Sequence, residues 1–389
     1  MDDLLLRNET RGGTASLVNA RIVLADKVVE GDLSLSGGLI VDGPVSGTAP
    51  VDFDGDYLIP GLIDLHTDAI EHHFQPRPGV QWPSAVGAAL AHDWQVLGSG
   101  ITTVLDSLSL GDYDSGGART AMLNRAIGGV NAAREAGLLK AEHYFHFRCE
   151  LSDPGLLPIL VEHIDNPYVR LLSMMDHTPG QRQWHDLALY RAFRRKRHNN
   201  FWTDEEFAVY LNERLAHQTR LVPAAREAIG RAGRERQIHI ASHDDTTIAD
   251  VEQSHGDGIT ISEFPTTLIA AQRARALGQS IVMGSPNVVL GGSHSGNVGA
   301  MSLAKAGLLD ILTSDYVPAS LLHGAFLVAE ALGDLPAAIR TVTSAPAAIV
   351  GFTDRGRIAP GLRADLLRVR VVDGFPVIAG IWVAGRQYL

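Results

Sequence analysis

The chain has 389 residues, of which 45% are hydrophobic and 20% charged, a composition typical of a folded globular protein rather than a disordered one. Its 33 lysine and arginine residues are outnumbered by 44 aspartate and glutamate residues, and the net charge of −11 argues against nonspecific nucleic-acid binding. A single cysteine excludes an intrachain disulfide. We expect a cytoplasmic protein with no secretory signal and no membrane span, since no apolar run approaches about 20 residues.

The two ends of the chain share one pattern. Short runs rich in valine, isoleucine and leucine alternate with glycine and aspartate, for example in residues 15–58 and 363–389. Such runs indicate strands joined by turns. We therefore expect residues 1–58 and 352–389 to form one small β-sandwich domain, and residues 59–351 to form a separate catalytic domain.

The middle of the chain alternates strand-like and helix-like segments, the pattern of a parallel sheet with crossover helices. The helix-like segments include residues 118–136, 204–231, 266–277 and 297–307. The eight strand candidates are residues 59–66, 101–106, 142–150, 169–176, 237–243, 258–263, 280–285 and 310–315. Eight such units predict an α/β fold of the (β/α)8 TIM-barrel type, whose active site lies just past the carboxyl ends of the strands.

Side chains that can bind metal follow five of the eight predicted strands. In chain order they are His66 and Asp68, then Glu150, then Asp176 and His177, then His243, Asp244 and Asp245, and finally Asp315. A single histidine is more often structural, and the pair His92 and Asp93 on a predicted helix is interpreted in that way. An aspartate after a strand is also a common helix N-cap, which remains an alternative for Asp68, Asp244 and Asp245. The joint pattern nevertheless favours a metal site.

This set of residues is typical of a centre that holds two divalent ions. Neutral imidazoles bind each ion, a carboxylate bridges the two ions, and a further carboxylate faces the bound water. His66 and Asp68 are two residues apart at a strand end, so both can point in the same direction. Water bound to such ions loses a proton near neutral pH, and Asp315 is placed to orient the hydroxide and accept its proton. The sequence therefore predicts a binuclear metal hydrolase.

The string "IPGLIDLHTD", together with the later strand-end Glu, His, His and Asp, resembles the amidohydrolase superfamily. Longer strings, among them "MDHTPGQRQ", "GGSHSGNV" and "LTSDYVPASLL", resemble its diphosphatases of phosphonate breakdown. The resemblance implies hydrolysis of a ribose 1-methylphosphonate 5-triphosphate to the 5-phosphate and pyrophosphate, by attack of a metal-bound hydroxide. It also implies one or two divalent ions, with zinc as the first choice and manganese or iron as alternatives.

The resemblance also implies a role for each ligand-type residue. His66 and Asp68 would bind one ion, Glu150 would bridge, His177 and His243 would bind the second ion, and Asp315 would act as general base and ligand. Two features depart from the superfamily pattern. The usual His-x-His after the first strand is His-Thr-Asp here, and the bridging residue is Glu150 on the third predicted strand, where many members use the fourth.

A phosphorylated ribose is strongly anionic, and arginines with bidentate guanidinium groups suit its oxygens. Arg77 lies between two prolines, Arg182 follows His177, and Arg148 lies two residues before Glu150. The glycine-rich stretch from Gly291 to Val298 is expected to bind anions through backbone amides and through Ser293, His294 and Asn297. Glu263 is expected to hold a ribose hydroxyl or a neighbouring arginine.

Two other classes of function stay open on the sequence alone. The same metal chemistry serves a hydrolase that acts on a cyclic amide or a deaminase that acts on an amino-purine. A barrel scaffold without turnover is a further alternative, which the intact set of ligand-type residues disfavours. We expect a small-molecule partner and no nucleic acid or membrane, and a homo-oligomer remains open.

Overall fold

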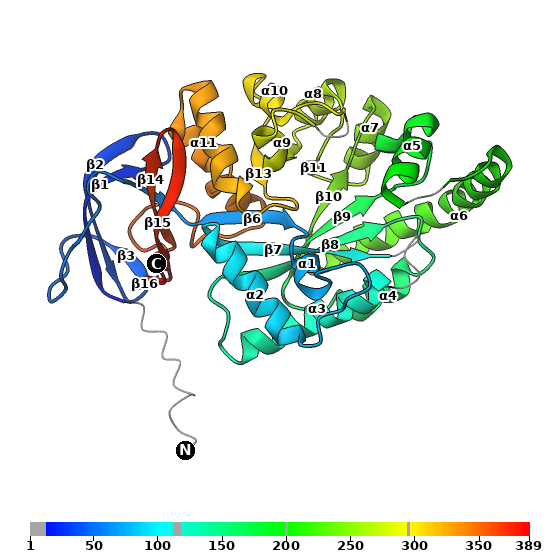
Figure 1. Cartoon of the computed structure of the whole chain (residues 1–389). Helices are drawn as coiled ribbons and strands as arrows, with labels where there is room; N and C mark the ends of the chain where they lie inside the picture. The colour runs from blue at the N-terminus through cyan, green and yellow to red at the C-terminus, as the bar shows by residue number, and fades with distance from the viewer. Residues whose placement is uncertain (1–12, 112–117, 199–200, 294–295) are drawn as a thin grey trace, which may run out of the picture.

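Eight parallel strands in the middle of the chain form a sheet that closes on itself as a barrel (Figure 1). The structure is a computed structural model and describes residues 13–389 apart from 112–117, 199–200 and 294–295. The barrel strands are β6 (Leu62–Thr67), β7 (Ile101–Leu110), β8 (Glu142–Glu150), β9 (Val169–Met175), β10 (His239–His243), β11 (Ile261–Glu263), β12 (Ser280–Gly284) and β13 (Ile311–Thr313). They pair in chain order from β6 to β13. The predicted eight-stranded barrel is confirmed.

The barrel closes where the first and last strands meet. A parallel bridge joins Thr67 to Asp315, and the Asp315 N–H donates to the His66 carbonyl at 2.9 Å. The buried Asp64 carboxylate adds to this seam, because its Oδ1 accepts from the backbone N–H groups of Ser314 at 3.1 Å and His66 at 3.2 Å. The seam fixes the relative positions of two segments that carry predicted site residues.

The interior of the barrel is filled by apolar side chains over part of its length. One buried cluster collects inward-facing residues from seven strands together with residues in and just after a helix that follows the barrel: Ile63, Leu65, Leu105, Leu171, Ala241, Ile261, Val282, Ile311, Ala347 and Val350. Inward residues further along the same strands are polar, such as Ser173, His243 and Glu263. A filled base and a polar mouth at the carboxyl ends are what a barrel enzyme requires.

Helices surround the barrel and cover its outer face (Figure 1). They are α1 (Ile70–Phe74), α2 (Ala85–Gly98), α3 (Ala118–Glu135), α4 (Leu156–His163), α5 (Leu187–His198), α6 (Asp204–Arg236), α7 (Ile248–Gly256), α8 (Leu268–Ala276), α9 (Ser285–Val289), α10 (Ala300–Lys305), α11 (Ser320–Leu332), α12 (Leu335–Arg340) and α13 (Ser344–Ile349). A short 3-10 turn covers Arg182–Trp184. The 33-residue α6 begins at a capping box on Thr203 and Glu206, and its first turns extend beyond the barrel. None of the described helices is long and apolar enough to cross a membrane.

The two chain ends meet in a second sheet of eight strands, coloured blue and red in Figure 1. Its strands are β1 (Ala15–Val23), β2 (Val28–Ser36), β3 (Leu39–Val41), β4 (Val51–Asp52), β5 (Tyr57–Pro60), β14 (Leu366–Val372), β15 (Phe375–Val383) and β16 (Arg386–Gln387). The antiparallel pairing of β5 with β14 joins the N-terminal and C-terminal strands. Phe53 stacks on Trp382 in the core of this sheet, with ring centroids 5.8 Å apart. A small β domain from both ends is therefore present, as predicted.

The small sheet and the barrel share apolar core. Residues of β5, β14 and β15 lie in one buried cluster with residues of the barrel strands and of α11. Tyr57 of β5 also meets Phe326 of α11 edge to face at 6.2 Å. Because β5 belongs to the small sheet and β6 to the barrel, the passage between them occurs at Gly61, close to the predicted boundary at residues 58 and 59. The domain limits themselves stay a prediction.

Candidate metal centre at the barrel mouth

A bulge in β6 brings His66 to the barrel mouth. The pairing of β6 with β7 advances by three residues from Asp64 to Thr67 but by two on the partner strand, from Val104 to Asp106. An extra residue in a strand re-aims the side chains that follow it. His66 is 1% exposed and lies against residues from the opposite side of the barrel. Local irregularity, rather than simple strand alternation, therefore positions this imidazole.

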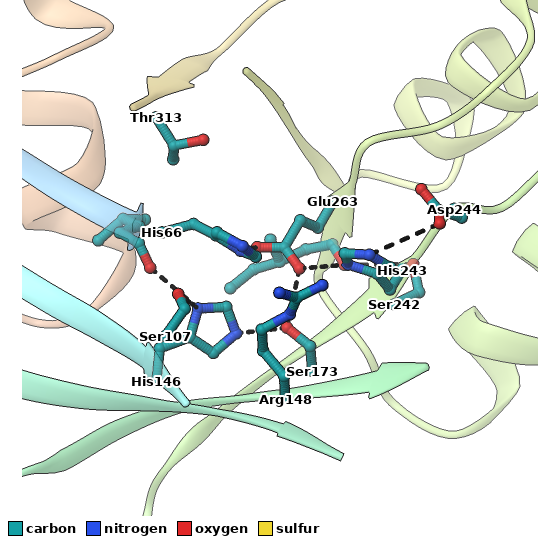
Figure 2. Close-up of polar contacts among 12 residues, drawn as sticks. His66, Ser107, His146, Arg148, Ser173, Ser242, His243, Asp244, Glu263 and Thr313 are labelled. Carbon is teal, nitrogen blue, oxygen red and sulfur yellow. Dashed lines mark hydrogen bonds and ion pairs between the residues drawn. The ribbon is translucent and has the colours of Figure 1, made fainter. Parts of the chain in front are cut away.

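Glu263, at the end of β11, accepts hydrogen bonds from three neighbours (Figure 2). Its Oε1 lies 2.7 Å from His66 Nδ1, and its Oε2 lies 2.7 Å from His243 Nδ1. The Ser173 hydroxyl of β9 donates to the same Oε2 at 2.8 Å. One buried carboxylate thus contacts imidazoles that come from the first and the fifth strands of the barrel.

The charge of Glu263 decides which ring nitrogens carry protons. Burial alone would raise the pKa of Glu263, but the facing His66 and His146 rings and the hydrogen bonds hold it well below its usual value. An ionised carboxylate can only accept hydrogen bonds. The Nδ1 atoms of His66 and His243 must therefore be the donors, and in the neutral imidazoles the lone pair lies on Nε2. That is the form in which histidine binds a metal.

His177 is arranged in the same way by a different carboxylate. Its Nδ1 lies 2.7 Å from Glu150 Oε2 at the end of β8. Its Nε2 lies 3.7 Å from Asp244 Oδ2, and His243 Nε2 lies 3.6 Å from the same oxygen. These separations are too long for hydrogen bonds. They suit ligands of one tetrahedral ion, which lie about 3.3–3.5 Å apart when each is about 2.0–2.1 Å from the metal.

A second set of acceptors lies beside His66. His66 Nε2 and Asp68 Oδ1 are buried, and neither atom has a hydrogen-bond partner in the described part of the chain. Buried polar atoms are normally paired, so two such atoms near one another suggest a missing ligand. Burial and the neighbouring Asp68 carboxylate raise the pKa of Asp315, and the nearby His66 opposes this by lowering it. His66, Asp68 and Asp315 therefore fit a second cation, which would relieve the repulsion between the two carboxylates.

Left-handed backbone occurs where strands end at this mouth. Asp244, Phe264 and Asp315, which follow β10, β11 and β13, have φ values of 57°, 55° and 55°. Residues other than glycine rarely adopt such values, and this strain often collects at functional sites. Here it turns the chain directly after each strand, so that Asp244 and Asp315 can present carboxylates to the mouth.

The predicted ligands do not all make the expected contacts. His66, His177 and His243 come together, with Asp68 and Asp315 nearby. Glu150, expected to bridge two ions, uses both oxygens in hydrogen bonds: Oε2 with His177 Nδ1, and Oε1 with Ser152 Oγ at 3.0 Å and the His177 N–H at 3.1 Å. These contacts favour a role in orienting His177.

The predicted substrate residues differ in where they lie and what they contact. Arg148 of β8 faces the mouth, where its Nη1 contacts Asp68 Oδ2 at 3.3 Å, and its Nε has no hydrogen-bond partner among the described residues. Arg182 is 6% exposed and pairs with Asp245, a contact that favours a structural role over binding of phosphate. Glu263 contacts His66 and His243 and, among the hydrogen bonds of the described residues, none with an arginine.

The other predicted substrate residues lie on loops. Arg77 is exposed in the turn that follows α1, where its carbonyl accepts from the Val80 N–H at 3.0 Å. Ser293 and Asn297 are half-buried between α9 and α10. His294 lies outside the described residues. Arg77 follows β6, and Ser293 and Asn297 follow β12, so both loops belong to the same face as the metal centre.

Sequence reasoning gave no role to three residues of this site. Asp244 was named among the side chains that can bind metal, with a helix cap as the alternative, and it lies between two histidines. His146 and Ser173 are fully buried and in contact with each other, and Ser173 also contacts Glu263. His146 precedes Arg148 by two residues on the same strand, so strand alternation could have placed it at the mouth. Ser173 left no comparable signal.

Known proteins resemble the chain in both fold and sequence. A crystal structure of an amidohydrolase superposes with a TM-score of 0.63 at 16% identity, covering 97% of this chain and 99% of that chain. N-acetylglucosamine-6-phosphate deacetylase from Pasteurella multocida gives 0.60 at 14% identity, covering 97% and 100%. These likenesses establish the fold alone. No protein-family model matches the chain.

The sequence relative is more informative. Alpha-D-ribose 1-methylphosphonate 5-triphosphate diphosphatase from Escherichia coli (strain K12) is 42% identical over 375 residues, which cover 95% of this chain and 98% of that protein. Identity of this level over nearly the full length of both proteins shows that the two share a fold and a family. The chain belongs to the alpha-D-ribose 1-methylphosphonate 5-triphosphate diphosphatase family, built on the amidohydrolase fold.

Proposed function

We propose that the chain hydrolyses alpha-D-ribose 1-methylphosphonate 5-triphosphate to the 5-phosphate and pyrophosphate, with divalent metal as cofactor. The named relative supports the substrate. The observation that carries the chemistry is the set of three imidazoles with Nδ1 held by carboxylates, which leaves His66, His177 and His243 with Nε2 available for a cation. A scaffold without turnover has no need for this arrangement.

Six residues would hold two ions. His177, His243 and Asp244 form one set, and His66, Asp68 and Asp315 form the other. Mixed imidazole and carboxylate ligands suit zinc, and also manganese or iron. When bound, divalent ions supply an acidic water and electrostatic stabilisation of the negative charge that develops during phosphoryl transfer.

Asp315 is proposed to accept a proton from the attacking water. A general base needs a carboxylate held within reach of the attacking water, and Asp315 lies at the mouth beside Asp68 and His66. The left-handed backbone at Asp315 and the hydrogen bond from its N–H to the His66 carbonyl hold it beside the first strand. Its carboxylate thus has a fixed position relative to His66.

The substrate's phosphates would contact cations and donors on the loops of the same face. Arg148 is the first candidate, because it already contacts Asp68 and its Nε has no hydrogen-bond partner within the described structure. Arg77, Ser293 and Asn297 are proposed to contact the outer phosphates or the phosphonate. Arg182 is proposed to support Asp245 and β10 instead. A homo-oligomer and a cytoplasmic location stay predictions.

Phosphorus NMR of the metal-loaded protein with this substrate tests the proposal. We expect signals of pyrophosphate and a 5-monophosphate, both lost in Asp315→Asn, while circular dichroism shows that the variant is folded. Stepwise release of orthophosphate would contradict the proposed point of attack. An unchanged spectrum with metal bound would contradict the substrate.

A further inference from the structure

We propose that Glu263 is a positioning residue shared by both metal sites. The inference rests on the proposed metal centre and names a residue that organises it. His66 belongs to one proposed ion and His243 to the other, yet both imidazoles donate Nδ1–H to the same carboxylate at 2.7 Å. One side chain therefore fixes the protonated nitrogen of a ligand at each site.

The geometry allows Glu263 to serve both rings at once. The imidazoles of His66 and His243 lie 6.2 Å apart between ring centroids and within 20° of parallel. The two carboxylate oxygens each accept from one ring, as Figure 2 shows. The Nε2 atoms then face different partners: His243 Nε2 faces Asp244, and His66 Nε2 is left without a hydrogen bond in the described structure.

Buried, hydrogen-bonded neighbours hold the Glu263 carboxylate in place. Ser173 donates to Oε2 at 2.8 Å, and its oxygen also contacts His146 Nε2. Because the Ser173 proton goes to Glu263, neutral His146 donates from Nε2 to Ser173, and its unprotonated Nδ1 can accept from the Ser107 hydroxyl at 3.2 Å. The His146 ring packs edge-on against His66, with ring centroids 5.0 Å apart. Glu263, His146 and Ser173 are at most 1% exposed. Water cannot replace the carboxylate without displacing these neighbours.

Glu150 provides a matched comparison within the same mouth. It also contacts an imidazole Nδ1 at 2.7 Å, but it orients a single proposed ligand, His177. Both carboxylates are buried and both are the last residue of a barrel strand. Removing Glu150 should disturb one ion, whereas removing Glu263 should disturb two.

Titration of the metal-free protein with Co²⁺, followed by its visible absorption, separates these expectations. The parent is expected to bind two ions per chain. Glu263→Ala should raise both dissociation constants by about 10–100-fold, the usual cost of losing the partner of a metal-binding histidine. Glu150→Ala should raise one of them by a similar factor and leave the other unchanged. Circular dichroism of the metal-free variants reports whether each is folded.

An isosteric variant covers the case in which Glu263→Ala does not fold. In Glu263→Gln, the amide oxygen can accept from one imidazole, while the NH₂ group can only donate. The other imidazole must then carry its proton on Nε2, so one of the two ions should bind tightly and the other weakly.

Three outcomes would overturn the inference. Glu263→Ala could weaken one ion or none, or Glu263→Gln could bind two ions with the affinity of the parent. If the parent binds fewer than two ions, the proposed two-ion centre is wrong, and so is the proposal that Glu263 serves two metal sites. The first two outcomes leave the proposed function intact, so the two failures can be told apart.

Discussion

Two clusters of histidine and aspartate occur in the described structure, one at the barrel mouth and one between the barrel wall and helix α2. The mouth cluster is formed by His66, His177, His243, Asp68, Asp244 and Asp315. The inner cluster is formed by His92 and Asp93 of α2, Asp106 of β7 and His143 of β8. His177, His243 and Asp244 of the mouth cluster lie within metal-binding reach of one another, and so do His92, Asp106 and His143 of the inner cluster. The two are alike in residue type, but the inner cluster is fully buried, whereas Asp68, His177 and Asp315 of the mouth cluster are half-buried.

The two clusters differ in the hydrogen-bond partners of their imidazole nitrogens and carboxylate oxygens. In the inner cluster, Asp106 contacts His92 Nε2 at 2.7 Å and His143 Nδ1 at 2.8 Å, and His143 Nε2 contacts Asp93 at 3.3 Å. Asp93 also accepts from the N–H groups of Lys140 and Ala141, at 3.0 Å and 2.9 Å. The inner cluster is thus closed by its own hydrogen bonds, with His92 Nδ1 as its one unpaired nitrogen among the described residues.

In the mouth cluster, His177 Nε2 and His243 Nε2 face the Asp244 carboxylate at separations that suit a cation. His66 Nε2 and Asp68 Oδ1 are buried without a hydrogen-bond partner among the described residues, and Asp315 interacts with both of these side chains. Residue types therefore do not identify a metal site. Unused lone pairs at ligand-to-ligand distances do, and they follow from carboxylates that hold the opposite nitrogen of each ring.

The largest expected effect is on turnover at the mouth. Asp315→Asn removes the proposed proton acceptor, and general-base catalysis contributes about 10²–10⁴-fold to a rate. We expect kcat for pyrophosphate release to fall by that factor, with unfolding of the metal-free protein changed little. Turnover within a few-fold of the parent would show that another group accepts the proton.

The counterpart in the inner cluster is Asp106→Asn. It leaves His143 facing an amide instead of a buried carboxylate, and breaking a buried charge pair costs about 3–5 kcal/mol. We expect chemical unfolding to report a loss of this size, while metal content measured on the folded protein stays the same. Loss of a bound ion from this variant would show that the inner cluster, too, binds metal.

A smaller effect is expected at the substrate's arginines. Arg148→Met removes a half-buried cation beside Asp68, and hydrogen bonds to charged groups contribute about 1.5–3 kcal/mol. We expect KM to rise by about tenfold or more. The matched variant Arg77→Ala, on an exposed turn, should raise it less. A larger rise in KM for Arg77→Ala than for Arg148→Met would show that the phosphates bind mainly at the outer loop.

The smallest effect is a pH dependence of the inner cluster. Burial alone would lower the pKa of His143, but the Asp106 and Asp93 carboxylates raise it to about 9. Since this exceeds the value of about 6.5 in an unfolded chain, the stabilisation is complete below pH 6.5 and is lost as the pH rises through 9.

Comparison of the parent with His143→Gln tests this window, with both proteins free of metal. Their difference in unfolding free energy should be largest below pH 6.5 and shrink as the pH rises through 9. Using the difference cancels titrations that the two proteins share. A difference that stays constant over this range would show that His143 is neutral in the folded protein.

The sequence predicted the barrel, its eight strands and the three mouth histidines because strand ends are visible as apolar runs that stop at polar residues. It could not predict which nitrogen of each ring is free, since this depends on contacts such as Glu263 with His66, 197 residues apart. Nor could it show that Arg182 is paired with Asp245, or that a bulge re-aims His66. Those facts depend on packing between distant segments.

The central claim is that the mouth binds metal and the inner cluster does not. X-ray anomalous scattering at the zinc edge, from crystals of the zinc-loaded protein, tests it directly. We predict a peak between His177 Nε2 and His243 Nε2, a second beside His66 Nε2, and none among His92, Asp106 and His143. A peak in the inner cluster, or an empty mouth in protein shown to contain zinc, would contradict the account.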